Sequence, residues 1–258
     1  MSFIETFKKI AGTSMAMANA MGAVFNPHKA PPLPELPIDE NYKIVFSPNN
    51  QKVRVFNKDK EIFNTYAVSG KPGYTTSEYE NLKDTGPIPR GTYYMTPSRY
   101  IKRNLRNITK FNGDIPGIAW GRGKFQLTPD PSTETFGRDG FNFHGGSKGS
   151  SSGCGDFANR DNCEYDKLVD DLHNKKIKLT PEIQKKLDEE GKKKEWDYTM
   201  NSIRETLFPA ANKGANLLPI NPIMFKQAPK QNLNSNWDKF FEVTKQFPRD
   251  KRVKVIVE

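Results

Sequence analysis

The sequence predicts a mainly β domain with added helices. In the first half of the chain, apolar and polar residues alternate with a period of two in short segments that turn-forming residues separate. From Asp161 onward, apolar residues recur instead at helical spacing, and one more period-two segment follows at 252–257. These three observations predict a β-rich core, a helical region after it, and a late strand that returns to the same sheet.

The expected strands are short and lie between clusters of Gly, Pro, Asn and Asp. Turns are expected at 48–50 and 57–60, and residues 69–73 break the pattern again. The strands between these breaks are residues 43–46, 52–56, 62–68, a strand entered from the proline-rich turn at 86–95, 118–127, 141–144 and 252–257.

Three helices are expected after the strands. The first has one apolar face, made of residues at i, i+3, i+4 and i+7: Tyr165, Leu168, Val169 and Leu172. Thr180 followed by Pro181 is a typical helix start and opens a Lys/Glu-rich helix within 175–205. The prolines of 208–231 predict a loop, after which Ser235 or Asn236 caps a last helix with three aromatic residues, Trp237, Phe240 and Phe241.

The chain divides into an N-terminal segment, a linker and one large domain. Residues 1–26 are only weakly apolar, and Glu5 lies where a signal peptide is basic, which favours a segment for docking or secretion over a cleaved signal. The many prolines of 27–41 predict a stiff linker. Residues 42–258 form the expected domain, in which about 175–250 is a helical insertion.

Composition narrows the range of functions. The net charge of +10 suits an anionic polymer such as cell wall, and no motif that reads nucleic acid is present. Two cysteines and three histidines at these spacings make neither a disulfide framework nor a structural zinc site. No cofactor or metal is expected, and no apolar run is long enough for a transmembrane helix.

The stretch GFNFHGGSKGSSSGCGD, residues 140–156, is the strongest candidate for chemistry. A nucleophilic cysteine needs a nearby base or positive charge to form its thiolate. His144 ends a predicted strand, and the glycines after it allow a loop to fold back and place Cys154 against the imidazole. The backbone N–H groups of Gly153 and Cys154 are candidates to stabilise an oxyanion. A loop without chemistry is the alternative that the spacing alone leaves open.

Four short matches, one of them a signature in two parts, occur in the same order as in a known family. Phe-Asn-Phe-His-Gly at 141–145 and Ser-Ser-Gly-Cys at 151–154 resemble the signature of L,D-transpeptidase-like (YkuD-type) domains. The similarity is greatest to type VI secretion effectors with L,D-transpeptidase or carboxypeptidase activity. Those effectors also carry motifs like the ones at 66–70, 84–93 and 137–141.

The resemblance implies an L,D-transpeptidase-type core in which Cys154 is the nucleophile and His144 the base. It implies a peptidoglycan stem tetrapeptide as substrate, cut before its terminal D-Ala, with carboxypeptidase, D-amino acid exchange or cross-linking as the outcome. It also implies an antibacterial effector that is made in the bacterial cytoplasm, is secreted and acts in the periplasm of a target cell. A periplasmic immunity protein and a secretion-system component, bound through the N-terminus, are the expected protein partners.

The sequence departs from the family motif directly after the cysteine. Gly155 and Asp156 stand where the motif has an apolar residue and an arginine. Arg138 is a candidate to bind the substrate carboxylate in place of that arginine, with structural pairing as an equal alternative. Three further residues are candidates for substrate binding: Gly145, Ser151 and Ser152.

Two other functions stay open at this point. A papain-like wall amidase or endopeptidase has its cysteine before its histidine, which would make His173 the base. In a non-catalytic wall-binding or secretion adaptor, His144 and Cys154 would be vestigial. On the main hypothesis, Cys163 is a small buried residue at a helix start, His173 lies at a helix end, and His28 has no role.

Overall fold

The computed structural model describes residues 35–102, 121, 123–146, 151–158, 160–207 and 236–258, and only the backbone of 197–207. Residues Met1–Leu36 and Pro37–Glu258 form two separate units. The N-terminal segment 1–26, most of the predicted linker and the predicted loop 208–231 lie outside the described residues. Within these ranges, no helix combines the length and the hydropathy that a bilayer-spanning segment needs.

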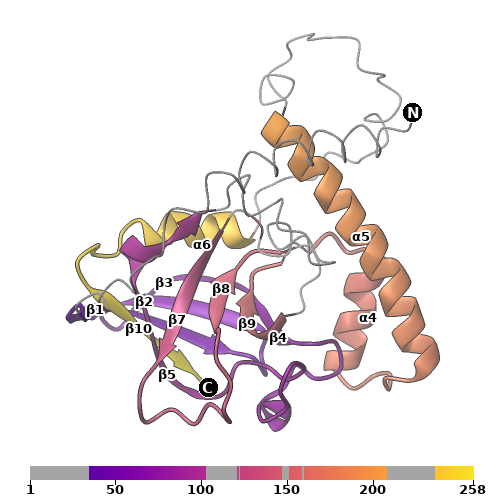
Figure 1. The fold of residues 1–258 in the computed structure, drawn as a ribbon, viewed down its shortest axis with the longest axis horizontal. Coiled ribbons are helices and arrows are strands. Elements are labelled where there is room, and N and C mark those ends of the chain that lie inside the picture. Colours follow the sequence, from indigo (N-terminus) through magenta and orange to yellow (C-terminus); the bar gives the residue numbers. More distant parts are fainter. Residues whose placement is uncertain (1–34, 103–120, 122, 147–150, 159, 208–235) are drawn as a thin grey trace, which may run out of the picture. The chain divides into compact units, whose positions relative to one another are not determined.

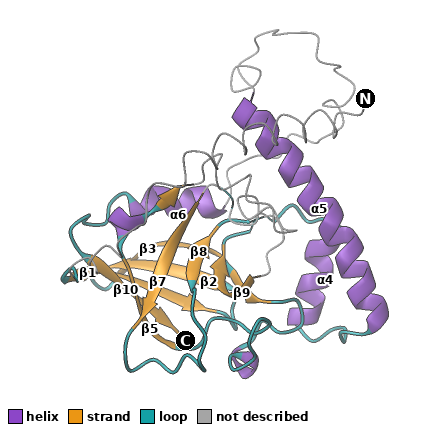
Figure 2. Cartoon of the chain, in the orientation of Figure 1, coloured by secondary structure: helices purple, strands orange, loops and turns teal. Residues whose placement is uncertain are grey.

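The second unit is mainly β, as the sequence predicts, and its described residues form a sheet of ten strands (Figures 1 and 2). The strands are β1 Ile38–Ser47, β2 Lys52–Asn57, β3 Lys60–Tyr66, β4 Val68–Gly70, β5 Gly91–Met95, β6 Ile101–Lys102, β7 Gly123–Pro129, β8 Asn142–His144, β9 Ser151–Asp156 and β10 Arg252–Val257. Their order in the sheet is β3-β2-β1-β10-β5-β7-β8-β9-β4, with β6 paired to β7. Two 3₁₀ turns lie between strands, at Ser77–Tyr79 and Pro97–Arg99.

The late strand returns to the sheet, as predicted. β10 lies between β1, to which it is parallel, and β5, to which it is antiparallel. Val253, Val255 and Val257 face the interior, and the residues between them are half-buried, which is the period-two pattern of its sequence. The two ends of the second unit therefore meet in the middle of one sheet.

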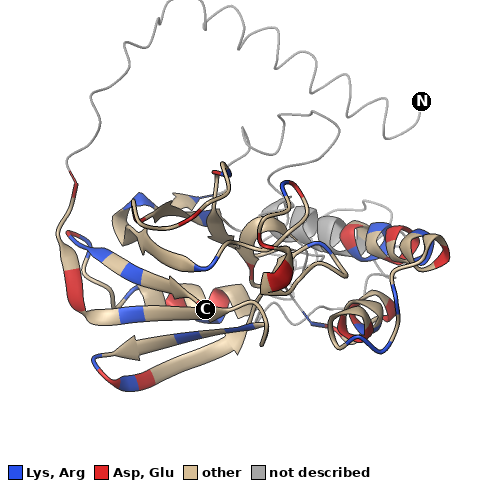
Figure 3. Ribbon diagram, turned by 90° about the horizontal axis from the view of Figure 1, so that it is seen from below, with Lys and Arg blue, Asp and Glu red and all other residues tan. Residues whose placement is uncertain are grey.

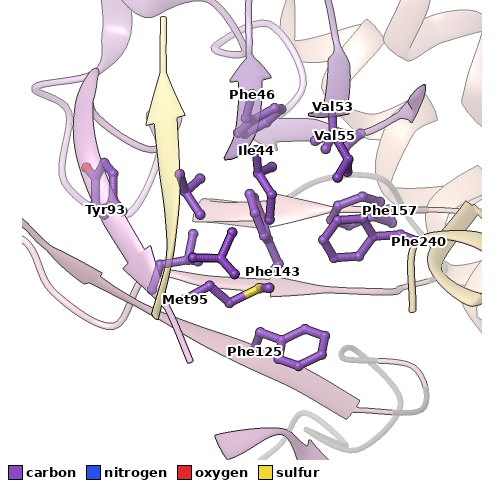
Figure 4. Packing of buried hydrophobic residues seen from close by; sticks show 14 of the residues in the cluster. Ile44, Phe46, Val53, Val55, Tyr93, Met95, Phe125, Phe143, Phe157 and Phe240 are labelled. Carbon is purple, nitrogen blue, oxygen red and sulfur yellow. The ribbon is translucent and has the colours of Figure 1, made fainter. Parts of the chain in front are cut away.

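The interior of the sheet is filled with aromatic and branched side chains (Figure 4). Phe143 packs edge to face on Phe46 and Phe157, with ring centroids 5.9 and 5.4 Å apart. Helix α6, Asn236–Thr244, adds Trp237 and Phe240 to this cluster. α6 is thus part of the β core, although it lies within the range 175–250 that the sequence predicts to be an insertion.

Helices α4, Glu164–His173, and α5, Pro181–Leu207, form a second apolar cluster and confirm the first two predicted helices. Thr180 caps α5, since its Oγ1 accepts the N–H of Ile183 at 3.3 Å. Acidic and basic side chains are interspersed along the pair (Figure 3). One ion pair is buried, with Lys194 Nζ 2.5 Å from Asp166 Oδ1.

Several side chains tie α4 to the strands. Arg160 pairs with Asp170 of α4, and its guanidinium carbon lies 4.6 Å from the ring centroid of Tyr66 in β3. At the end of α4, His173 Nδ1 is 2.8 Å from Thr75 Oγ1, and its Nε2 is 3.0 Å from the carbonyl oxygen of Asn49. The helix is therefore anchored by polar contacts at its last turns.

The structure differs from the sequence prediction at several strands, and the short β6 has no predicted counterpart. β1 begins at Ile38, inside the predicted linker, and the expected strand 62–68 is divided at Ala67 into β3 and β4. The Gly/Ser stretch predicted as a loop contains β9, which pairs with β8 and β4. Its inward position Gly155 lies against Phe143, where a Cβ would be 2.5 Å from the ring. Because the phenylalanine fills that space, β9 lacks the apolar alternation that reveals a strand.

Candidate active site

Strands β7, β8 and β9 present two rows of polar side chains on the face opposite Phe125 and Phe143. Lys124 pairs in register with His144, and His144 with Asp156. Side chains alternate along a strand, so residues two positions away share the face. One row is Lys124, His144 and Asp156, and the adjacent row is Gln126, Asn142 and Cys154. Cys154 and His144 therefore lie on the same face of neighbouring parallel strands.

The Cys154 thiol lies in a polar setting on this face. Its Sγ is 3.7 Å from Nδ2 of Asn142 and 3.8 Å from the carbonyl oxygen of Gly140. The Asn142 amide also donates to that same carbonyl, which fixes its orientation. The Asn142 amide and the Gly140 carbonyl thus hold the Cys154 side chain at a defined position on this face.

The His144 imidazole is buried, with 3% of its surface exposed. Its Nε2 lies 3.1 Å from Ser151 Oγ, and its Nδ1 lies 3.4 Å from the Gly145 carbonyl oxygen and 3.8 Å from Asp156 Oδ1. Burial lowers the pKa of His144, and the negative charge of Asp156 opposes that shift. The ring is consequently neutral at pH 7, which is the form that can accept a proton.

The motifs quoted from the sequence meet around one carbonyl group, that of Gly86. The Arg138 guanidinium donates to the carbonyl oxygens of Gly86, Glu80 and Pro87, at 3.0, 2.6 and 2.8 Å. The N–H of Gly153 donates to the same Gly86 oxygen at 3.1 Å. Gly153 has φ +73°, in the left-handed region that favours glycine, and a Cβ there would lie 2.8 Å from Arg138 Nη2. These contacts fix the backbone on which Cys154 stands.

The contacts of Gly86 bear on two predicted roles. Three hydrogen bonds to carbonyl groups occupy the Arg138 guanidinium, which is the structural pairing that the sequence left as an alternative. The Gly153 N–H is also engaged within the fold, so it is not available to an oxyanion in this conformation. The Cys154 N–H, which belongs to β9, stays a predicted oxyanion donor.

The structure also places the remaining predicted substrate-binding residues. Ser151 is the hydrogen-bond partner of His144, and Gly145 packs so close to Trp237 that a Cβ would lie 2.8 Å from that side chain. Ser152 Oγ is buried and has no hydrogen-bond partner in the described part of the chain. Their role toward a substrate stays a prediction.

The second cysteine and the second histidine are held in other surroundings. Cys163 is the N-cap of α4, at the helix start where the sequence predicts it, and burial raises the pKa of its thiol to about 11. Both ring nitrogens of His173 bond to Thr75 and Asn49, outside the two polar rows. This geometry disfavours the papain-like alternative, in which His173 serves Cys154.

One group of side chains has the composition of a metal site. Ligand atoms of Asp161, Cys163 and Asp166 lie within 4.8 Å of one another. The Lys194 ammonium lies 2.5 Å from Asp166 Oδ1 and 3.5 Å from Asp161 Oδ1, so a positive charge already occupies this position. The carboxylates act here as partners of a buried lysine.

Sequence reasoning missed four residues of the two polar rows: Lys124, Gln126, Asn142 and Asp156. Asn142 lies two positions before His144, and Asp156 lies two positions after Cys154. That spacing indicates a shared face only once β9 is known to be a strand. Lys124 comes from β7, and only the strand register places it beside His144.

With the site described, comparison with known proteins gives the family. The model of the Tlde1 domain family matches residues 40–183, more than half of the chain. The chain therefore belongs to the Tlde1 domain family, a transpeptidase-like family of type VI secretion effector domains. The matched range contains both polar rows and confirms the predicted effector family, while the YkuD-type signature remains a resemblance.

The other comparisons add little. No curated protein matches the chain. Among solved structures, the chain is similar to Bd1075 of Bdellovibrio bacteriovorus, with 20% identity and a TM-score of 0.31 over 53% of this chain and 47% of that one. The chain thus spans about half the length of that protein, and a likeness this remote supports no argument about function.

Proposed function

We propose that this chain is a cysteine enzyme that modifies peptidoglycan by acting on stem tetrapeptides, as an L,D-carboxypeptidase, an L,D-transpeptidase or both. The observation that supports it most is the position of Cys154 and a neutral, buried His144 on one face of adjacent parallel strands. A nucleophile, a base and a carboxylate behind the base form the set of groups used for acyl transfer through a covalent intermediate. Membership of a transpeptidase-like effector family supports the same reaction class.

The proposed reaction begins with the Cys154 thiolate attacking the carbonyl carbon that precedes the terminal D-Ala. His144 takes the thiol proton, and Asp156 stabilises the imidazolium that forms. The tetrahedral oxyanion accepts a hydrogen bond from the Cys154 backbone N–H. The C–N bond then breaks, the leaving amine takes the proton from His144, and an acyl thioester remains on Cys154.

The acceptor that resolves the thioester decides the outcome. Water gives a shortened tripeptide, a free D-amino acid gives exchange, and the amine of a second stem peptide gives a cross-link. In each case His144 removes a proton from the acceptor, and the Cys154 thiolate leaves.

Incubation of the full chain with purified muropeptides, followed by mass analysis, tests this function. Loss of one D-Ala from disaccharide tetrapeptides is the expected result, with dimers or exchanged termini where an acceptor is present. The Cys154→Ala protein should leave the same muropeptides unchanged. Cleavage at the sugar–peptide amide or within the stem would instead identify an amidase or endopeptidase.

The site of action is part of the proposal. Peptidoglycan lies outside the cytoplasm, so expression in the cytoplasm of a Gram-negative host should be tolerated, whereas fusion to a periplasmic signal should cause swelling or lysis. The periplasmic Cys154→Ala form should be harmless, because binding alone does not consume donor peptides. Equal toxicity of both periplasmic forms would support the wall-binding adaptor, and protection by a periplasmic immunity protein is expected of an effector.

A further inference from the structure

Lys124 is the one residue of the two polar rows that carries a full positive charge at neutral pH. It lies directly across from His144, on the side opposite Asp156. Cys154 is in the adjacent row on the strand beyond His144, two strands and two residues away from Lys124, so their backbones are about 12 Å apart across the sheet.

The electrostatics agree with this geometry. Burial lowers the pKa of Lys124, and the negative charge of the Cys154 thiolate opposes the shift. The charge of Lys124 in turn helps to lower the pKa of His144. The ammonium is therefore close enough to both reacting groups to be affected by them, and it is half-buried. A half-buried ammonium is poorly hydrated, which favours an anion beside it.

The proposed substrate supplies such an anion next to the bond that breaks. Only the amide nitrogen and one α-carbon separate the carboxylate of the leaving residue from the carbonyl carbon that Cys154 attacks. In related motifs an apolar residue and an arginine follow the cysteine, and in this chain Gly155 and Asp156 stand at those two positions. Arg138 donates hydrogen bonds to three carbonyl groups. Asp156 therefore offers no cation for that carboxylate, and Arg138, whose charge also interacts with Cys154, directs its Nη1 and Nη2 groups at backbone carbonyl oxygens.

We propose that Lys124 is the specificity-determining residue that binds the terminal carboxylate of the peptide, and that it restricts the enzyme to the last residue of a stem. This inference rests on the proposed function. An ammonium whose charge interacts with Cys154 selects a substrate whose free carboxylate directly follows the scissile bond, and it disfavours a longer chain or an amide at that position. The leaving amino acid carries its carboxylate away unchanged, so no further reactant is needed.

The test compares two substrates, a disaccharide tetrapeptide with a free C-terminal carboxylate and the same molecule as its C-terminal amide. The full-length wild-type protein should prefer the acid about 10- to 100-fold in kcat/KM, the range expected of one charge-assisted hydrogen bond. In Lys124→Gln, kcat/KM for the acid should fall by that factor, mainly through KM, and the amide should be affected far less. The acid-to-amide ratio should approach one.

Two further variants make the result specific. Lys124→Arg keeps the charge and should recover most of the preference for the acid. Lys52→Gln makes the same charge change at an exposed position in β2 and should keep the wild-type ratio. Thermal melting of each variant establishes that it is folded before its kinetics are read.

The contrary outcomes are distinct. If Lys124→Gln lowers kcat/KM equally for the two substrates, Lys124 acts on the thiolate, on His144 or on another carboxylate, and the inference is wrong. If the wild-type protein releases the terminal residue from acid and amide equally well, the inference fails and the proposed function stands. If the wild-type protein cleaves neither substrate, the proposed function fails, and this inference falls with it.

Discussion

The chain contains two groups that each combine one cysteine, one histidine and one aspartate, with the cysteine and histidine ten positions apart in both. The strand group is His144, Cys154 and Asp156, and the helix group is Cys163, Asp166 and His173. In the strand group, the cysteine and the histidine lie on the neighbouring parallel strands β9 and β8, whose register brings their side chains onto one face. In the helix group the ten positions run along α4, where ten residues extend about 15 Å.

The surroundings of the two groups differ as much as their geometry. The Cys154 thiol lies near an amide donor and a lysine, whereas burial raises the pKa of Cys163 to about 11. Asp156 lies beside an imidazole, and Asp166 lies beside a buried ammonium. Equal composition and spacing therefore lead to a candidate catalytic site in one group and to structural contacts in the other, and four predictions test that difference.

The two cysteines should show the largest difference. Cys154→Ala should lower the release of D-Ala by about 10³-fold or more, because the thiolate is the proposed nucleophile. Cys163→Ala should stay within about threefold of wild type, since it removes only a half-buried side chain at a helix start. Steady-state assays on a disaccharide tetrapeptide measure both. Loss of activity in the Cys163 variant alone would reverse the assignment.

The two histidines should differ nearly as much. His144→Ala should be about as inactive as Cys154→Ala, and the double variant should be no worse, because residues that act as one unit lose activity non-additively. His173→Ala should retain activity and melt at a lower temperature, since its contacts with Thr75 and Asn49 anchor α4. An inactive His173 variant beside an active His144 variant would favour the papain-like order.

The two aspartates should separate catalysis from stability. Asp156→Asn should lower kcat/KM by about 10- to 100-fold. It should also move the acidic limb of the pH profile to lower pH, because the carboxylate that raises the pKa of His144 is gone. Asp166→Asn should leave the kinetics of the folded protein nearly unchanged but cost about 3–5 kcal/mol of stability, since it leaves Lys194 buried without that partner. Similar kinetic losses in both variants would contradict the comparison.

The smallest expected effect is in the pH dependence of stability. Burial lowers the pKa of both His144 and His173, so below about pH 6.5 the unfolded chain binds more protons than the folded protein. Stability should therefore fall as the pH drops from 7 to 5. His173→Gln should lessen this fall by about 2–4 °C in melting temperature. An unchanged pH dependence in that variant would show that His173 titrates alike in both states.

Much of the fold could be predicted because inward side chains alternate with outward ones. β2, β8 and β10 follow that pattern, and α4 shows its apolar face directly. β9 could not be predicted, because its inward position is Gly155 and not a large apolar residue. Phe143 fills the space beside that glycine. The contribution of α6 to the core was also hidden, since nothing in its sequence says which surface its aromatic residues meet.

The site was predictable in part for a related reason. The spacing and the family resemblance single out Cys154 and His144, and the strand register then places them on one face. Lys124, Asn142 and Asp156 depend on that register, which a single sequence does not specify. Arg138 could be identified from the sequence as a charged residue near the motif. Its three hydrogen bonds to carbonyl groups could be found only from the structure.

The central claim is that an acyl group is transferred to Cys154. The most direct measurement is peptide mapping by mass spectrometry after the full chain is mixed with a disaccharide tetrapeptide and quenched in acid within its first turnovers. The account predicts a thioester of the tripeptide on the peptide that contains Cys154, one equivalent of released D-Ala for each acylated protein, and neither product in Cys154→Ala. A label on Cys163, or release of D-Ala at an unchanged rate by Cys154→Ala, would contradict it.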